Sequence, residues 1–169
     1  MSGGIDSTIS ALLLKEEGYE VEGVYMKLHA KPGYHEIHLA RAQKAAHFVG
    51  IPLHILDLQA DFEEKVFKPF IATYKEGKTP NPCALCNRNI KFGAMVEFAD
   101  SIGAEFVATG HYIRHDTQYL LQAEDDTKDQ SYFLFYIDPS LIQRLIFPLG
   151  NRKKSDIKEF ASKIDGLES

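Results

Sequence analysis

Two cysteines three residues apart, Cys83 and Cys86, are the only thiols of this chain. A thiolate is a strong nucleophile and can carry sulfane sulfur, so this spacing indicates redox, metal or catalytic chemistry rather than a secreted disulfide framework. A structural zinc ion would need two further ligands, and the chain has no second cysteine pair. Histidines could supply the missing zinc ligands only if the fold brought them close to the cysteines; the candidates are His29, His35, His38 and His111. The pair therefore favours thiol chemistry, and we expect no metal held by these residues.

A second group of chemically useful side chains stands at the N-terminus, in the run Ser2-Gly3-Gly4-Ile5-Asp6-Ser7-Thr8. Glycines allow a tight turn whose amide N–H groups converge on one anion, while hydroxyls and a helix N-terminus add further attraction. The run is not a Walker A motif, because no Gly-Lys-Ser/Thr follows the glycines. It predicts a phosphate cradle or, alternatively, a capped helix start in which Asp6 or Ser7 only satisfies free amides.

The elements that would position these residues alternate between helix and strand. Helical periodicity predicts helices over residues 6–17, 36–49, 61–74, 89–102 and 155–164. Short apolar runs predict strands over 21–26, 51–58, 104–109 and 118–123, and the aromatic segment 131–136 fits either type. Strands separated by helices at this spacing require crossover connections, so we expect a parallel sheet.

Both cysteines fall in a segment, residues 77–87, whose prolines predict a loop. Functional side chains are often placed on such loops. With a helix beginning near Arg88, Cys86 would lie just before its N-terminus. The helix dipole and Arg88 would then lower the pKa of the thiol.

Composition places limits on the class of protein. The 169 residues are 44% hydrophobic and 25% charged, as in a globular domain with a full core. No apolar run is long enough to span a bilayer and no signal peptide is visible, so we expect a cytoplasmic protein without a membrane partner. The net charge of −5 argues against a surface built wholly to coat nucleic acid. Basic residues that could form local patches are Arg88 and Lys91, and the trio Arg152, Lys153 and Lys154, which we interpret as solvated surface charge.

The glycine-rich run begins the chain, although a phosphate turn in an α/β fold normally follows a strand. The other end, residues 165–169, is polar and has no feature of a natural terminus. We therefore expect residues 1–169 to form one domain truncated at both ends, with the first strand missing.

Residues 2–7 resemble the PP-loop signature of adenine-nucleotide α-hydrolases, which cleave ATP between its α and β phosphates. Four further segments, in order, resemble the bacterial tRNA-specific 2-thiouridylases: residues 79–92, 108–112, 128–134 and 147–150. The resemblance implies a Rossmann-like α/β fold with a parallel sheet flanked by helices. It also implies ATP-dependent 2-thiolation of a tRNA wobble uridine, with central and C-terminal β-barrel domains that this chain lacks.

The same resemblance implies roles for individual residues. ATP would contact Ser2, Gly3, Gly4, Ile5, Asp6, Ser7, Met26 and Gly110. The tRNA or its target base would contact Asn81, Pro82, Cys83, His111, Lys128, Asp129 and Gln130, and Cys86 would be the nucleophile. Many family members carry an acid where this chain has Cys83, so Cys83 would either face the base or form a reversible disulfide with Cys86. Mg²⁺ is expected with ATP, and Asp125 and Asp126 are either metal ligands or part of a solvated turn.

In the implied reaction the C2 oxygen of uridine attacks the α phosphate, and pyrophosphate leaves an adenylated base. A persulfide sulfur, delivered by a sulfur-relay protein to a second cysteine beyond residue 169, then replaces AMP. Cys86 would either release that sulfur as sulfide or share in the displacement. Two alternatives remain: another PP-loop ATP pyrophosphatase of the amidotransferase or lysidine synthetase type, and a non-catalytic nucleotide-binding module.

Overall fold

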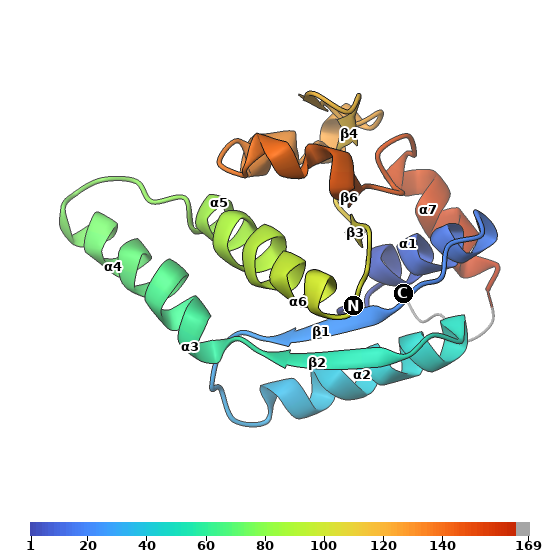
Figure 1. The fold of residues 1–169 in the computed structure, drawn as a ribbon, viewed down its shortest axis with the longest axis horizontal. Coiled ribbons are helices and arrows are strands. Elements are labelled where there is room, and N and C mark those ends of the chain that lie inside the picture. The colour runs from blue at the N-terminus through green and yellow to red at the C-terminus, as the bar shows by residue number, and fades with distance from the viewer. Residues whose placement is uncertain (165–169) are drawn as a thin grey trace.

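The computed structural model describes residues 1–164, and its first half alternates helices with parallel strands (Figure 1). The order is α1 (Ile5–Glu16), β1 (Gly23–Lys27), α2 (Tyr34–Val49) and β2 (Leu53–Asp57). β1 and β2 pair in parallel, with Gly23 opposite Leu53 and Lys27 opposite Asp57. The helix α2 runs along this pair, so it forms the crossover that a parallel pair requires (Figure 1). The predicted helices and strands of this half are confirmed within two residues at each end.

Two long helical runs follow, and each contains a π-helical segment. The first joins α3 (Gln59–Phe62), η1 (Glu63–Phe67) and α4 (Lys68–Lys75). Pro69 has no N–H, so it cannot donate a helical hydrogen bond to the carbonyl of Lys65. The side-chain amide of Asn89 donates to that carbonyl oxygen instead, at 3.4 Å. This contact connects the first helical run to the second.

The second helical run corrects our expectation of a loop over 77–87. It begins at Pro82 and joins α5 (Pro82–Cys86), η2 (Asn87–Ala94) and α6 (Met95–Ser101), so both cysteines are helical. The side chain of Asn81 accepts a hydrogen bond from the amide of Ala84 at 3.1 Å, and proline occupies the first helical position. Asn as a cap and Pro at the first position start a helix, so two prolines in a segment did not exclude one.

The second half contains shorter elements. β3 (Val107–Ala108) pairs in parallel with β6 (Leu145–Ile146), which the sequence did not reveal, and β4 (Arg114–His115) pairs antiparallel with β5 (Leu120–Leu121). Three 3₁₀ segments, η3 (Asp126–Lys128), η4 (Ser131–Leu134) and η5 (Pro139–Arg144), precede the final helix α7 (Lys154–Ser162). Parallel strands flanked by helices confirm the predicted α/β class.

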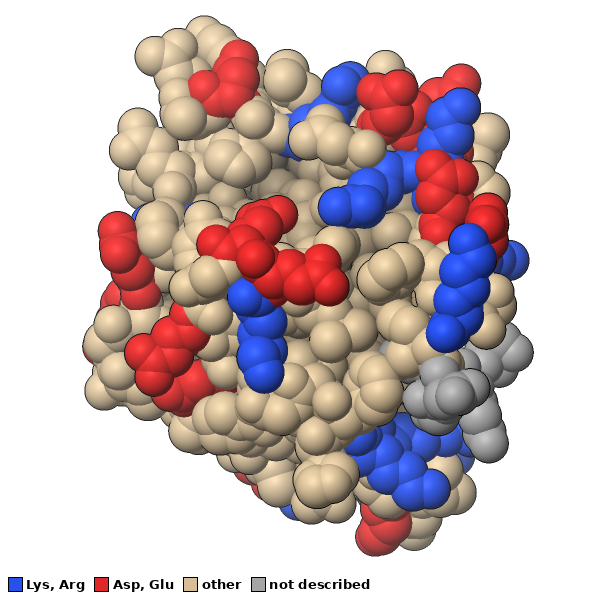
Figure 2. All heavy atoms as spheres, turned by 90° about the vertical axis from the view of Figure 1, so that its right-hand side faces the viewer, with Lys and Arg blue, Asp and Glu red and all other residues tan. Residues whose placement is uncertain are grey.

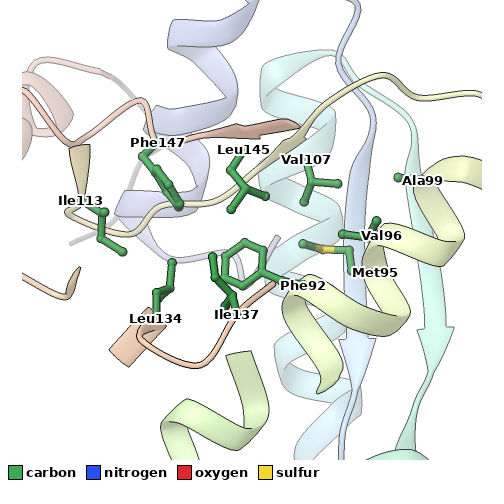
Figure 3. Close-up of a cluster of buried hydrophobic side chains, with 10 residues drawn as sticks. All are labelled: Phe92, Met95, Val96, Ala99, Val107, Ile113, Leu134, Ile137, Leu145 and Phe147. Carbon is green, nitrogen blue, oxygen red and sulfur yellow. The ribbon is translucent and has the colours of Figure 1, made fainter. Parts of the chain in front are cut away.

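A buried apolar cluster fixes the second helical run against β3 and β6 (Figure 3). Its ten members are Phe92, Met95, Val96, Ala99, Val107, Ile113, Leu134, Ile137, Leu145 and Phe147. Burying each large apolar side chain contributes about 1.5–3 kcal/mol relative to exposure. The cluster therefore holds the helix that carries the cysteines in a fixed position beside the end of β3.

The two parallel pairs are not joined to each other by hydrogen bonds between strands in the described part of the chain. β1 bonds to β2 and β3 bonds to β6, and within residues 1–164 the other edge of β1 and the other edge of β3 have no partner strand. The N-terminal amine of Met1 donates to the carbonyl of Val24 at the free edge of β1. A cavity of 1320 Å³ extends along residues of both strands.

Candidate nucleotide and thiol site

The glycine-rich run forms a turn that closes onto the N-terminus of α1. Gly3 has φ of +77°, and a Cβ there would lie 2.6 Å from the carbonyl carbon of Arg41, so only glycine fits. The hydroxyls of Ser2 and Ser7 lie 3.2 Å apart, and Ser7 donates to the carbonyl of Gly4 at 3.0 Å. Hydroxyl groups and a helix N-terminus thus converge on one side of the turn, as an anion site requires.

A lysine from the far end of the described chain completes this turn. Lys154 Nζ lies 2.5 Å from Asp6 Oδ1, and the Tyr112 hydroxyl donates to the same oxygen at 3.1 Å. Burial and the Asp6 carboxylate raise the pKa of the Tyr112 phenol, which therefore stays protonated and keeps donating. Our interpretation of Lys154 as solvated surface charge is wrong: it is 148 positions from Asp6 in sequence, and only the fold brings the two together.

The cavity follows β1 and β3 along their length and reaches the turn beside their carboxyl ends. Predicted nucleotide-contacting residues that line it are Ser2, Asp6, Ser7, Met26 and Gly110. A Cβ on Gly110 would lie 3.2 Å from the carbonyl carbon of Asp6, so this glycine lets the end of β3 approach α1 closely. The structure therefore brings together the loop and both strand ends that the sequence proposed for ATP.

Three lysines, Lys91, Lys128 and Lys154, also line the cavity, together with the acids Asp6, Glu20, Glu22 and Glu105. On the outer face seen in Figure 2, basic and acidic side chains likewise lie intermixed. The cavity as a whole is therefore not basic. Positive charge near the turn comes from individual side chains, Lys154 beside Asp6 and Lys91 beside His111.

His111 is buried at one side of the cavity, where its ring joins two side chains. Lys91 Nζ lies 3.2 Å from His111 Nε2, and Thr109 Oγ1 lies 2.8 Å from Nδ1. An ammonium group only donates, so Nε2 accepts from Lys91 and Nδ1–H donates to Thr109. Burial and the Lys91 charge lower the pKa of His111 to about 3, so the ring is neutral. The described contacts give His111 the role of positioning Lys91.

This arrangement predicts a pH dependence of stability. Between pH 6.5 and 3 the unfolded chain protonates His111 while the folded chain does not, so stability is full above pH 6.5 and falls as pH drops. From pH 7 to pH 5 wild type should lose about 2 kcal/mol more than His111→Gln, which cannot titrate. Urea unfolding at both pH values measures the difference. Equal losses in the two proteins would show that the His111 pKa is not depressed by folding.

The two cysteines differ in exposure: Cys83 is exposed and Cys86 is half-buried. Burial raises the pKa of the Cys86 thiol, and the nearby charge of Lys91 opposes that rise. Our expectation of a lowered pKa is wrong, because the helix starts at Pro82 rather than after Cys86. Arg88 also points elsewhere, with its guanidinium 4.1 Å from the centre of the Tyr136 ring. Lys91 is therefore the cation that acts on Cys86.

Other predicted tRNA-contacting residues hold the surrounding loops. Asp129 accepts hydrogen bonds from the Ala123 amide at 2.9 Å and the Ser131 hydroxyl at 2.7 Å. Gln130 Oε1 accepts from the Tyr112 amide at 3.1 Å, which links this loop to the partner of Asp6. These side chains therefore fix the position of Lys128 at the cavity.

The acidic turn beside this loop is stabilised by its own hydrogen bonds. Asp125 accepts from the Thr127 hydroxyl at 2.6 Å and from the amide of Lys154 at 2.9 Å, so it supports the start of α7. Among residues 1–164, no group of three or more His, Cys, Asp or Glu is arranged to hold a metal ion. Helices in the same residues are all too short or too polar to cross a bilayer.

Parallel strands flanked by helices, with a glycine-rich turn at the N-terminus of the first helix, define an α/β domain with a candidate anion site. The family model described as the tRNA methyl transferase HUP domain matches residues 1–168, and the chain belongs to that family. Relatives named tRNA-specific 2-thiouridylase MnmA are similar over almost the whole chain. The relative from Sulfurimonas denitrificans is 70% identical over 167 residues, covering 99% of this chain and 49% of its own length.

A second relative of the same name, from Campylobacter jejuni strain 81116, is 58% identical over 169 residues, covering all of this chain and 50% of its own length. A third, from Campylobacter hominis, is 52% identical over 168 residues, covering 99% of this chain and 46% of its own. The chain thus spans about half the length of these relatives.

Proposed function

We propose that the protein containing this chain catalyses ATP-dependent 2-thiolation of a tRNA uridine, and that residues 1–169 form its ATP-binding and thiol-bearing domain. One observation carries the proposal: Lys91 lines the cavity beside the glycine-rich turn and acts on the Cys86 thiol. Cys86 itself does not line the cavity, so Lys91 is the residue that links the sulfur nucleophile to the proposed phosphate cradle. The names of the similar proteins support sulfur as the transferred atom.

The residues present fit ATP. Gly3 lets the turn pack against the backbone of Arg41, and Gly110 lets the end of β3 pack against Asp6, so both glycines hold the turn in place. The Ser2 and Ser7 hydroxyls are exposed on the turn, where they can donate to a phosphate. Lys154 can exchange its contact with Asp6 for a phosphate oxygen without leaving the cavity. The β and γ phosphates would lie on this turn, with the adenosine toward Met26 and Gly110. Mg²⁺ would enter with the triphosphate and neutralise part of its charge.

In the proposed reaction the C2 oxygen of a flipped-out uridine attacks the α phosphate, and pyrophosphate leaves toward the turn. Lys91, held by His111, offsets negative charge near the reacting atoms and favours the thiolate of Cys86. Sulfur then replaces AMP at C2. Cys86 either releases the sulfur as sulfide from a persulfide or shares in the displacement.

The whole protein would contain parts that lie outside residues 1–169. We place there its central and C-terminal β-barrel domains and a second cysteine that carries the persulfide. A sulfur-relay protein would load that cysteine, tRNA would bind across Asn81, Pro82, Cys83 and the loop at Lys128, and the reaction would occur in the cytoplasm. This chain alone would bind ATP without completing thiolation.

The test is tRNA-dependent pyrophosphate release by the intact gene product, supplied with ATP, unmodified tRNA and a sulfide source. Mass spectrometry of the digested tRNA scores 2-thiouridine. We expect both products to appear together and neither to form without tRNA. Pyrophosphate without tRNA dependence or thiolation would retain the PP-loop activity and overturn the substrate assignment, as would a methylated base in place of the thiolated one.

A further inference from the structure

The two cysteines lie on one stripe of the helix that begins at Pro82. Positions 84 and 87 of this helix are buried, and Cys83 and Cys86 occupy the neighbouring stripe at the boundary with solvent. Residues three apart on a helix are surface neighbours, with Cα atoms about 5 Å apart. Disulfides form across Cα separations of roughly 4.4–6.8 Å, which this pair meets, but they also need Cβ atoms roughly 3.5–4.5 Å apart. Helical neighbours have Cβ atoms about 5–6 Å apart, so the first turn of the helix must shift when the bond forms.

Cys83 and Cys86 lie at the start of the helix, where the backbone can shift to bring the two sulfur atoms together. Cys83 lies in the first turn, where amide N–H groups have no partner within the helix, and the Asn81 side chain bonds only to Ala84. Cys83 is exposed, while Cys86 is half-buried near Lys91. The exposed thiol can therefore rotate toward the half-buried one.

We propose that Cys83 is the resolving thiol of Cys86, so that the pair releases sulfide by forming a disulfide within α5. When Cys86 carries a sulfane sulfur as Cys86–S–SH, the Cys83 thiolate attacks the Cys86 Sγ. The Cys83–Cys86 S–S bond forms, the bond from Cys86 Sγ to the outer sulfur breaks, and HS⁻ leaves. The two cysteine sulfurs are oxidised to a disulfide and the outer sulfur is reduced to sulfide. A dithiol reductant then restores both thiols and is itself oxidised to a disulfide.

The inference rests on the proposed function in taking Cys86 as the thiol that meets the persulfide of the second cysteine. The Cys86 thiolate attacks the outer sulfur of that persulfide, which yields Cys86–S–SH and frees the thiolate of the second cysteine. The inference adds that this chain contains both partners of the release step. Sulfide could then be delivered beside the phosphate cradle without a thiol from another part of the protein. The step needs neither ATP nor tRNA, so it can be tested separately from thiolation.

The experiment loads the intact gene product with an inorganic polysulfide, removes the excess, and follows sulfide release by a fluorescent bimane derivative. Peptide mapping without reductant identifies the disulfide formed. Wild type should release sulfide as the Cys83–Cys86 peptide appears. The isosteric variant Cys83→Ser, at an exposed position, should keep its persulfide and release sulfide slower by about tenfold or more. Cys86→Ser, with Cys83 intact, is the matched control and should form no such disulfide.

Sulfide release from Cys83→Ser at the wild-type rate would overturn the inference. So would a disulfide between Cys86 and any other thiol, with Cys83 left free. Circular dichroism of each variant establishes that the fold is kept. If sulfide release is coupled to the Cys83–Cys86 disulfide but the protein makes no 2-thiouridine, this inference stands and the proposed function is refuted. If the protein makes 2-thiouridine but releases sulfide without that disulfide, only this inference is refuted.

Discussion

Cys86→Ser should abolish 2-thiouridine formation by the intact gene product, with kcat lowered by on the order of 10³-fold or more, as for removal of an essential nucleophile. Serine has nearly the same volume as cysteine, so the half-buried site should accept it without loss of the fold. A hydroxyl at this position is neither ionised at neutral pH nor able to carry sulfane sulfur. Quantification of 2-thiouridine over time measures the effect.

Measuring pyrophosphate release distinguishes adenylation of the tRNA from the later transfer of sulfur. The residues proposed for ATP are intact in Cys86→Ser, so one burst of tRNA-dependent pyrophosphate should persist after thiolation is lost. Asn89→Ala, on the same helix, is the matched control, because its side chain makes one long contact to the carbonyl of Lys65. Wild-type thiolation by Cys86→Ser would favour a PP-loop enzyme that needs no thiol.

Lys154→Met should weaken ATP binding about 10- to 100-fold, which is the value of a charge-assisted hydrogen bond to phosphate. Methionine keeps most of the length of the side chain and removes its charge. The variant also leaves the Asp6 carboxylate facing the phosphates with only the Tyr112 hydroxyl as a partner. Isothermal titration calorimetry with Mg²⁺ and ATP measures the Kd.

The neighbouring Lys153→Met is the matched control, because its side chain is exposed and does not line the cavity beside the turn. It should bind ATP like wild type. Thermal unfolding of both variants separates loss of the Asp6 contact from loss of a phosphate contact. Equal Kd values for the two variants would show that Lys154 serves only to hold the turn.

Local patterns were enough to predict the alternation of helices and strands. Periodic apolar residues predicted α1 and α2, and short β-branched runs predicted β1 and β2, because each element buries one face of its own sequence. The helical start at Pro82 could not be told from a loop, because prolines are typical of loops while Asn81-Pro82 is also a typical helix start. Strand β6 has two residues and no periodicity that a sequence could show.

The sequence predicted those parts of the site that lie in one continuous segment. It did not predict contacts between residues that are far apart in the sequence. The glycine-rich turn was visible as a contiguous run, and the structure places it at the cavity. The contact of Lys154 with Asp6 depends on the packing of α7 against α1, which no local pattern shows. The raised pKa of Cys86 likewise depends on burial of the helix, which sequence position alone does not reveal.

The open edges of β1 and β3 have a consequence for how the domain unfolds. No ladder of hydrogen bonds in residues 1–164 joins the β1–β2 pair to the β3–β6 pair, while α1 packs against both α2 and α7. Side chains join the two halves instead, through α1, the contact of Asn89 with Lys65 and the packing of Met26 against the buried cluster. Amides along the facing edges of β1 and β3 should therefore exchange faster than amides inside each strand pair, and a ligand that spans the strand ends should slow them.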